Sequence, residues 1–331
     1  MTKPDTTPYD DIPAFILGCT REIWEDRGVG TKLARYYAPD CLVRAPTGLT
    51  TSMAGVAADT LATLHQFPDR ELVGEDVIWD DCGDGSFLSS HRLISVMRHT
   101  GDGAFGAASG ALVKSRIIAD CWVKNGIITE EWLVRDGAAF AAALGLAPRA
   151  LAERLATEDI ARFGKVRFFA AHDEVVREYR PRLDTDPACA RVAEAYREIW
   201  GAQTPSAIRD HYAPGTEVAL PGHARANGWA EFDRFVISVL ASVPDAVLTL
   251  HSATVNREPE RPVRVALRWA LDGTHSGWGR FGTPAGAPLH IMGLSHVHLS
   301  GQQIIAEWLL FDEVAIWKQI IAHERGAEAP R

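Results

Sequence analysis

The stretch EEWLVRD at residues 130–136 decides the fold, because AEWLLFD repeats it at residues 306–312. Both stretches contain Glu-Trp-Leu and end on Asp, and they stand 176 residues apart. Nearly the same spacing relates three further pairs of segments: REIW at 21–24 and 197–200, YAP at 37–39 and 212–214, and FPD at 67–69 with VPD at 243–245. Self-similarity at a fixed period is the signature of a repeated structural unit. The chain is therefore predicted to be a tandem duplication.

Each copy is expected to open with a helix. Asp186 followed by Pro187 is typical of an N-cap and a first helical turn. After this pair, apolar residues recur at the spacing of one helix face: Val192, Ala195, Tyr196 and Ile199. In the first copy, Asp11 and Pro13 precede an equivalent face, which is formed by Ile16, Cys19, Thr20 and Ile23.

The later part of each copy changes to the composition of strands. Residues 87–97 and 263–271 are predicted strands that lead into Gly-rich turns. Residues 112–123 and 288–299 follow as further strands, and a polar turn joins each of them to a Glu-Trp-Leu stretch. Each copy is thus predicted to be a meander of antiparallel strands behind N-terminal helices, which is an α+β fold.

A connector of mixed charge separates the two copies. Residues 149–164 and 165–180 both have the composition of helices, with acidic and basic residues interspersed. We therefore expect three parts: a first domain at 10–144, a solvated helical connector at 145–186, and a second domain at 187–325.

Composition limits the partners that we expect. The 331 residues carry a net charge of −9, and no run of Lys or Arg could follow a phosphate backbone, so nucleic acid is not expected as a partner. No window approaches the roughly 18 consecutive apolar residues of a membrane span, and the start, MTKPDTTPYDD, lacks the features of a signal peptide. These features predict a soluble, cytoplasmic protein without a membrane partner. The five cysteines have no CxxC spacing, so most are expected to be buried and no zinc cluster is indicated.

Three sequence patterns carry a family resemblance. They are VALRWALDGTHSG at 265–277, FGTPAGAPL at 281–289, and hydrophobic-Glu-Trp-x-x-x-Asp in both copies. In these patterns the chain resembles two tandem SnoaL-like polyketide cyclase domains of the nuclear-transport-factor-2-like superfamily. The resemblance implies two cone-shaped domains, each a curved antiparallel sheet closed by N-terminal helices around an apolar pocket. Since single-domain members usually dimerise through the sheet, the two copies are expected to form an intramolecular pseudo-dimer.

The resemblance also implies where proton transfer would occur. Similar cyclases place an acid/base Asp directly after the Trp of the last strand, but here Leu133 and Leu309 occupy that position. Glu131 and Glu307, directly before the Trp, would share the pocket face by strand parity. Burial would raise the pKa of such a carboxyl group and suit it to general acid/base catalysis. The alternative is that the two Glu form structural ion pairs with Arg92 and Arg268, which are expected on adjoining strands.

The favoured function is a cofactor-independent lyase, isomerase or cyclase that acts on a small hydrophobic carbonyl or hydroxylated substrate. The second copy is favoured as the active one because it keeps more of the family pattern. Its predicted catalytic residues are Glu307 as proton carrier, Arg268 as the group that tunes it, and His275 and Tyr212 as substrate-orienting groups. The predicted substrate-binding residues are Trp200, Trp229, Trp278, Phe281, Leu309 and Ser295 in the second copy, with Glu131, Arg92 and Tyr37 in the first.

Two other functions stay open. One is a non-catalytic small-molecule binding or scaffold protein. The other is a metal-dependent hydrolase, in which His296 and His298 would bind a metal together with Asp120 or His91. Against the metal, strand parity favours the contact between the copies as the place of the two histidines. No cofactor and no metal are predicted, Asp136 and Asp312 are expected to be helix caps, and further association into a homodimer is left open.

Overall fold

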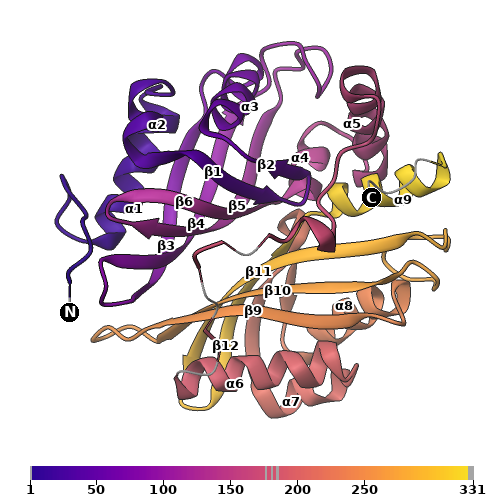
Figure 1. Ribbon diagram of the computed structural model, residues 1–331. Helices are drawn as coiled ribbons and strands as arrows, with labels where there is room; N and C mark the ends of the chain where they lie inside the picture. The colour runs from indigo at the N-terminus through magenta and orange to yellow at the C-terminus, as the bar shows by residue number, and fades with distance from the viewer. Residues whose placement is uncertain (1, 176, 180–181, 184–185, 327–331) are drawn as a thin grey trace.

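Two units with the same order of helices and strands make up the computed structural model, which describes residues 2–175, 177–179, 182–183 and 186–326 (Figure 1). Each unit contains one six-stranded sheet, with strand orders β2-β1-β6-β5-β4-β3 and β8-β7-β12-β11-β10-β9. The predicted α+β duplication is therefore confirmed.

The first unit comprises four α-helices and six strands among the described residues. The helices are α1 (Ile12–Thr20), continued by a π-helical turn (Arg21–Glu25), α2 (Thr31–Tyr36), α3 (Met53–Gln66) and α4 (Gly137–Ala143). The strands are β1 (Tyr37–Ala45), β2 (Gly48–Thr50), β3 (Glu71–Asp81), β4 (Ser86–Arg98), β5 (Leu112–Lys124) and β6 (Ile127–Arg135).

The second unit repeats this series. Its helices are α6 (Pro187–Tyr196), continued by a π-helical turn (Arg197–Gly201), α7 (Ile208–His211), α8 (Trp229–Ser242) and α9 (Glu313–Glu324). Its strands are β7 (Tyr212–Ala219), β8 (Arg225–Asn227), β9 (Val247–Asn256), β10 (Val263–Thr274), β11 (Pro288–Ser300) and β12 (Gln303–Phe311).

Each sheet contains one parallel pair within the predicted antiparallel meander. Strands β3 to β6 pair antiparallel in chain order, as do β9 to β12. The first long strand of each unit then lies parallel to the last, β1 beside β6 and β7 beside β12. Glu131 and Glu307 therefore lie on strands with a neighbour on both sides, which places them near the middle of the sheet.

The predicted helix caps are confirmed. The carboxylates of Asp11 and Asp186 accept hydrogen bonds from the backbone at the starts of α1 and α6. Asp136 accepts from Ala139 N at 3.0 Å, and Asp312 accepts from Val314 N at 2.9 Å. Each of these carboxylates satisfies a backbone N–H that has no partner within its own helix.

Among the described residues of the connector, only the first half forms an α-helix. Helix α5 (Pro148–Phe163) matches the prediction, but the described residues of 165–180 contain only a short 3-10 turn (Ala171–Asp173). Here Val166 and Phe169 are buried in two different apolar clusters, and Phe169 N donates to Pro46 O at 3.1 Å. Packing against both units and pairing with the first unit's backbone outweigh the helical composition of this segment.

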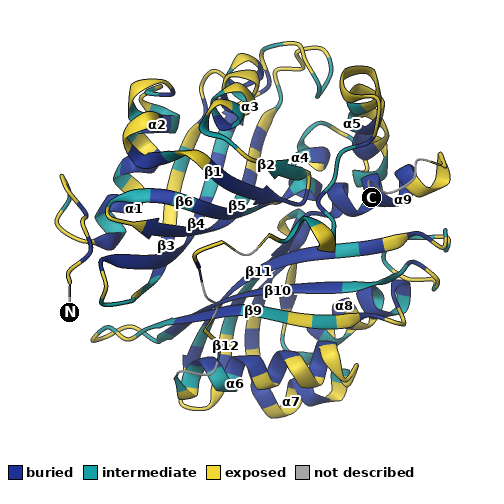
Figure 2. Cartoon of the chain, in the orientation of Figure 1, coloured by how far each residue is buried: buried dark blue, intermediate teal, exposed yellow. Residues whose placement is uncertain are grey.

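The two sheets pack face to face, with most helices on their outer sides (Figures 1 and 2). Between the sheets lies an apolar cluster that draws on both units and the connector: Leu88, Ile118, Trp122, Trp132, Val134, Phe169, Tyr179, Met292, Leu294 and Leu310. The predicted intramolecular pseudo-dimer is thus confirmed. Among the described residues, no helix is long and apolar enough to cross a membrane.

The repeated Arg and Trp lie at this contact between the units. The Arg268 guanidinium lies 3.6 Å from the Trp132 ring centre, and Arg92 lies 3.7 Å from the Trp308 ring centre, so each unit contributes one cation to one ring of the other. Such a reciprocal exchange is expected at an interface with two-fold pseudo-symmetry. The predicted pairing of Arg92 with Glu131 and of Arg268 with Glu307 is wrong, because one strand separates the members of each pair and the two side chains point to opposite faces.

The histidines of β11 also face this contact, as strand parity predicted. His296 Nε2 lies 2.9 Å from Ser90 Oγ, and His298 Nε2 lies 3.7 Å from Asp76 Oδ2. His91, by contrast, faces the interior of the first unit. In the described part of the chain, no group of three or more His, Cys, Asp or Glu side chains is arranged to hold a metal ion.

Candidate functional site

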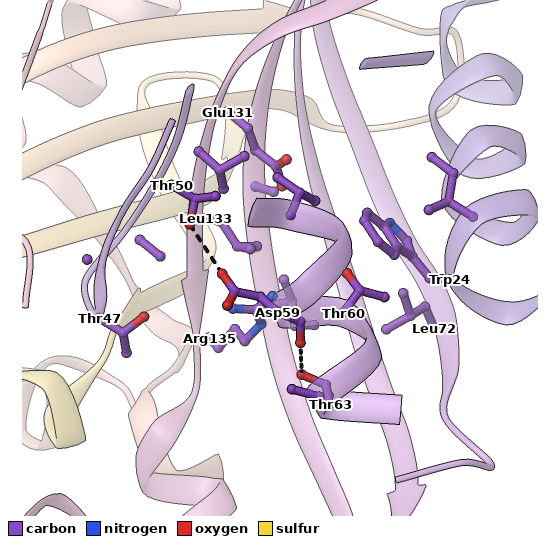
Figure 3. Close-up of a pocket in the computed structure, with 18 of the residues that line it drawn as sticks. Trp24, Thr47, Thr50, Asp59, Thr60, Thr63, Leu72, Glu131, Leu133 and Arg135 are labelled. Carbon is purple, nitrogen blue, oxygen red and sulfur yellow. Dashed lines mark hydrogen bonds between the residues drawn. The ribbon is translucent and has the colours of Figure 1, made fainter. Parts of the chain in front are cut away.

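A cavity of about 350 Å³ lies inside the first unit, between its sheet and helices α1 and α3 (Figure 3). On β6, Glu131, Leu133 and Arg135 alternate with residues of the sheet interface, so all three side chains face the cavity. Strand parity therefore predicted correctly that Glu131 and Leu133 share the pocket face. Helix α5 and Lys318 of α9 add side chains to the lining.

One carboxyl group lies on the apolar wall of this cavity. The Tyr37 hydroxyl donates to Glu131 Oε2 at 2.8 Å, and Glu131 is only 8% exposed. Burial raises the pKa of Glu131 above its ordinary value, an effect that the hydrogen bond from Tyr37 partly opposes. Burial and the Glu131 charge raise the pKa of Tyr37 well above its ordinary value, so its hydroxyl keeps its proton.

A histidine and two cysteines that line the same cavity are neutral. Burial lowers the pKa of His91 to about 4, so its imidazole is uncharged near neutral pH. Burial raises the pKa of the Cys19 thiol to about 12, and that of Cys121 lies well above the ordinary value. Both thiols are therefore weak nucleophiles. Glu131 is the cavity group best suited to exchange protons with a ligand.

The helix that covers the cavity presents polar side chains to it. Asp59, Thr60 and Thr63 of α3 all line the cavity, and Asp59 Oδ2 accepts from Thr50 Oγ1 at 3.3 Å (Figure 3). At the equivalent positions of α8 the second unit has Phe235, Val236 and Val239, which are buried in its core. A polar inner face on one helix and an apolar inner face on its repeat are consistent with one open and one filled interior.

Large side chains fill the equivalent space of the second unit. Leu93 and Ile117, which line the first cavity, correspond to Trp269 and Gly293. A Cβ atom at Gly293 would overlap the Trp269 ring, so the missing side chain leaves the space that the indole occupies. Tyr196 stands where the first unit has Thr20, and it is fully buried.

Glu307 is closed off by two tyrosines. The hydroxyls of Tyr196 and Tyr212 donate to its two carboxyl oxygens, the latter at 2.7 Å, and Glu307 is 1% exposed. Burial raises the pKa of Glu307, and the two hydrogen bonds oppose that rise. The sequence favoured the second unit as the active one, but the cavity of about 350 Å³ belongs to the first.

The structure brings together only part of the predicted second-unit site. Glu307, Tyr212 and Ser295 belong to one buried hydrogen-bonded group, since Ser295 and Glu307 both contact Tyr196. Trp200 and Leu309 are buried in the surrounding core, and Trp229 Nε1 donates to Tyr212 O at 2.8 Å.

Four predicted residues lie elsewhere. Arg268 faces the first unit, where it lies 3.4 Å from Asp120. His275 follows the last residue of β10, roughly 30 Å along the strand from the level of Glu307 at about 3.3 Å per residue. Phe281 packs against His275, and Trp278 is 72% exposed in the same connection. None of these groups is placed to act on Glu307.

Sequence reasoning missed Arg70 and Arg135 and did not assign His91 to the first-unit cavity. A comparison of the two repeats could have identified these three residues. The second unit has Ala246, Phe311 and Leu267 at the equivalent positions, all of them buried apolar side chains. Positions where one repeat is polar and the other apolar mark the open interior.

Parts of the chain are similar to known proteins. A family profile described as SnoaL-like polyketide cyclase matches residues 190–320. IdmH, a proposed polyketide cyclase from Streptomyces antibioticus, is 20% identical with a TM-score of 0.36, and the match covers 41% of this chain and 100% of IdmH. A proposed SnoaL-like polyketide cyclase from Jannaschia sp. CCS1 is 18% identical with a TM-score of 0.36, over 46% of this chain and 100% of that one. AclR, a proposed hydroxylase from Streptomyces galilaeus, is 17% identical with a TM-score of 0.34, over 44% of this chain and 84% of AclR.

A comparison with proteins of curated function gave no match. The family profile covers the second unit, and the first unit repeats the order of its helices and strands. Residues 190–320 are therefore similar to the SnoaL-like family, and the first unit is a structural repeat of the unit that contains them.

Proposed function

We propose that the first unit is a cofactor-independent enzyme of lyase, isomerase or cyclase type, in which Glu131 transfers a proton to and from a small hydrophobic carbonyl substrate. One observation carries this proposal. Glu131 is a carboxyl group with a burial-raised pKa on the wall of a cavity of about 350 Å³, and its partner is a tyrosine hydroxyl. A carboxylate whose pKa is raised toward the working pH is a more effective general base than an exposed one.

In the proposed reaction, the ionised Glu131 removes a proton from the carbon next to the substrate carbonyl. The electron pair of that C–H bond moves toward the carbonyl oxygen and forms an enolate. The Tyr37 hydroxyl, which now donates to Glu131, would donate to this oxygen and stabilise its charge. Glu131 then returns the proton to the same or another carbon. Alternatively, the enolate carbon attacks a second carbonyl carbon of the same molecule, and Glu131 gives its proton to the alkoxide that forms.

The second unit acts in this account as a scaffold. Its sheet buries the outer face of the first sheet, and helix α9 packs on α5 beside the cavity. The predicted cytoplasmic location, the lack of a nucleic-acid partner and further association into a homodimer stay predictions.

Proton exchange in D₂O tests the proposal without knowledge of the product. The wild-type protein is incubated with aryl ketones, cyclic ketones and 1,3-diketones, and loss of the α-proton signal is followed by NMR. At least one class is expected to exchange faster than in buffer, with a rate that rises with pH through a pKa above 4.5 because Glu131 must be ionised.

The stability of the protein should change in the opposite direction over the same pH range. Because the folded-state pKa of Glu131 is raised, its contribution to stability is present below pH 4.5 and is lost as pH rises through the raised value.

Ligands that raise the melting temperature without any α-proton exchange would contradict catalysis and indicate a binding protein.

A further inference from the structure

Two arginines face the cavity without a protein partner for their charge. Arg135 lies on β6 four residues after Glu131, and Arg70 precedes β3 and is 9% exposed. In the parts of the chain that the structure describes, neither side chain has an ion pair within 4.0 Å or a hydrogen bond, and the buried Nε of Arg70 has no acceptor. A guanidinium group has five N–H donors, and leaving the buried Nε of Arg70 unpaired is costly. Arg135 is exposed at the end of β6, so its donors are open to a ligand in the cavity.

The two guanidinium groups affect each other electrostatically. Burial and then the charge of Arg135 lower the pKa of Arg70 to about 10, so Arg70 stays protonated near neutral pH. The nearest opposing charges do not neutralise them. Glu25 is near Arg70 but accepts from Leu72 N at 2.6 Å. Glu131 acts most strongly on the charge of Arg135, followed by Asp312 and Asp59, but none of the three forms an ion pair with it within 4.0 Å. An anionic group placed between the two arginines would relieve their repulsion.

The repeat provides an independent observation. The second unit has Ala246 and Phe311 where the first has Arg70 and Arg135, and both are buried in its apolar core. The second unit forms the same sheet and helices without arginine at these positions, so the fold does not require them. They occur in the unit whose interior is open.

We infer that Arg70 and Arg135 bind a carboxylate at one end of an elongated apolar substrate whose carbonyl group lies beside Glu131. A planar carboxylate matches the fork of N–H donors on a guanidinium group. Glu131 and Arg135 are four residues apart on one strand, which separates their Cα atoms by roughly 13 Å. The reacting carbon and the carboxylate should therefore lie about 10 Å apart, the length of a chain of about eight carbons.

Other cations at the cavity favour the same ligand charge. Arg162 and Arg167 also line the cavity, while Lys318 is already paired with Asp159 at 2.6 Å. On a chain with a net charge of −9, this local excess of cations attracts anions toward the cavity. The carbonyl end of this inference rests on the proposed function, whereas the carboxylate end rests on the arginines alone.

Calorimetric titration with a graded set of keto acids tests the inference. The probes are phenyl ketones with a terminal carboxylate, from 4-oxo-4-phenylbutanoate to 10-oxo-10-phenyldecanoate, and their methyl esters. We expect the acid with about eight carbons to bind wild type roughly 10- to 100-fold more tightly than its ester, the range typical of a charge-assisted hydrogen-bonded pair.

Arg135→Gln and Arg70→Gln should each remove most of this preference while leaving the affinity for the ester unchanged. Arg135→Lys, which keeps the charge but loses the planar fork, should retain part of it. Circular dichroism and melting temperature show whether each variant is folded. If one of the two Gln variants does not fold, the other still tests the inference. Equal binding of acid and ester, or no binding by any acid at millimolar concentration, would overturn the inference.

The same probes separate this inference from the proposed function, since their α-proton exchange can be followed by NMR. Exchange without any preference for the acid would overturn the arginine assignment and leave Glu131 as the base. Acid-selective binding without exchange would support the arginines and contradict catalysis. Tighter binding of a phosphonate analogue than of the carboxylate would overturn the choice of a carboxylate.

Discussion

Glu131→Gln is expected to slow α-proton exchange by about 10²- to 10⁴-fold, the usual contribution of a general acid or base, whereas Glu307→Gln should leave the rate close to that of wild type. The two residues occupy the same position of the repeated motif, so the second variant is a matched control. Glu131 lines the open cavity, but Glu307 is enclosed by Tyr196 and Tyr212. Exchange rates of the three proteins, measured well below their melting temperatures, check this expectation.

Glu307→Gln should lower the stability of the protein more than Glu131→Gln does. In Glu307→Gln an amide NH₂ would face one of two tyrosine hydroxyls that now donate to a carboxylate, and the resulting mismatch in a fully buried site should cost about 1–3 kcal/mol. Glu131 has one such partner and borders a cavity, so Glu131→Gln should cost less. A Glu307 variant that loses activity as completely as the Glu131 variant, with its fold intact, would contradict the assignment of the active unit.

Arg268→Ala is expected to lower the free energy of unfolding by about 3 kcal/mol, because it removes one member of a buried ion pair. The variant would leave Asp120 buried opposite an empty space, and it would also remove the guanidinium that stacks on Trp132. Burial already raises the pKa of Asp120, so an unpaired Asp120 should take up a proton more readily still. Urea denaturation followed by tryptophan fluorescence measures the loss.

Arg92→Ala is the matched control for this prediction. Arg92 stacks on Trp308 in the same way, but its carboxylate partner Glu75 is partly exposed and also bonds Arg116. We therefore expect a smaller loss of stability from Arg92→Ala than from Arg268→Ala. Adding Asp120→Ala to Arg268→Ala should restore part of the loss, since the charge left unpaired is then gone. A loss below about 1 kcal/mol for Arg268→Ala, the range of an exposed pair, would contradict a structural role at the contact.

The fold could be predicted from the sequence because the same sequence patterns occur in both copies. A fixed spacing of 176 residues, helix caps at equivalent positions and strand periodicity all indicated the same unit twice. Strand parity was sufficient to place Glu131 and Leu133 on the cavity face and His296 and His298 at the contact between the sheets. These predictions needed only the two-residue periodicity of a strand, which can be read from a single sequence.

The choice of the active unit could not be made from motifs. The second unit keeps more of the family pattern, but its interior is filled by Trp269 lying across Gly293. That packing depends on two residues of neighbouring strands together, and neither residue alone indicates a closed pocket. The predicted Arg–Glu ion pairs were wrong because one strand lies between the two residues of each pair. The order of strands in the sheet could not be read from local periodicity.

In the proposed function, the first unit binds and converts the ligand while the interior of the second is filled. The stoichiometry of ligand binding distinguishes the two units when it is measured by calorimetry on wild type and on the double variant Leu93→Trp, Ile117→Gly. This variant transfers the filling pair of the second unit, Trp269 and Gly293, to the equivalent positions of the first. We expect one site per chain in wild type and none in the folded variant. Two sites per chain, or undiminished binding in the variant, would contradict the assignment of the ligand to the first unit.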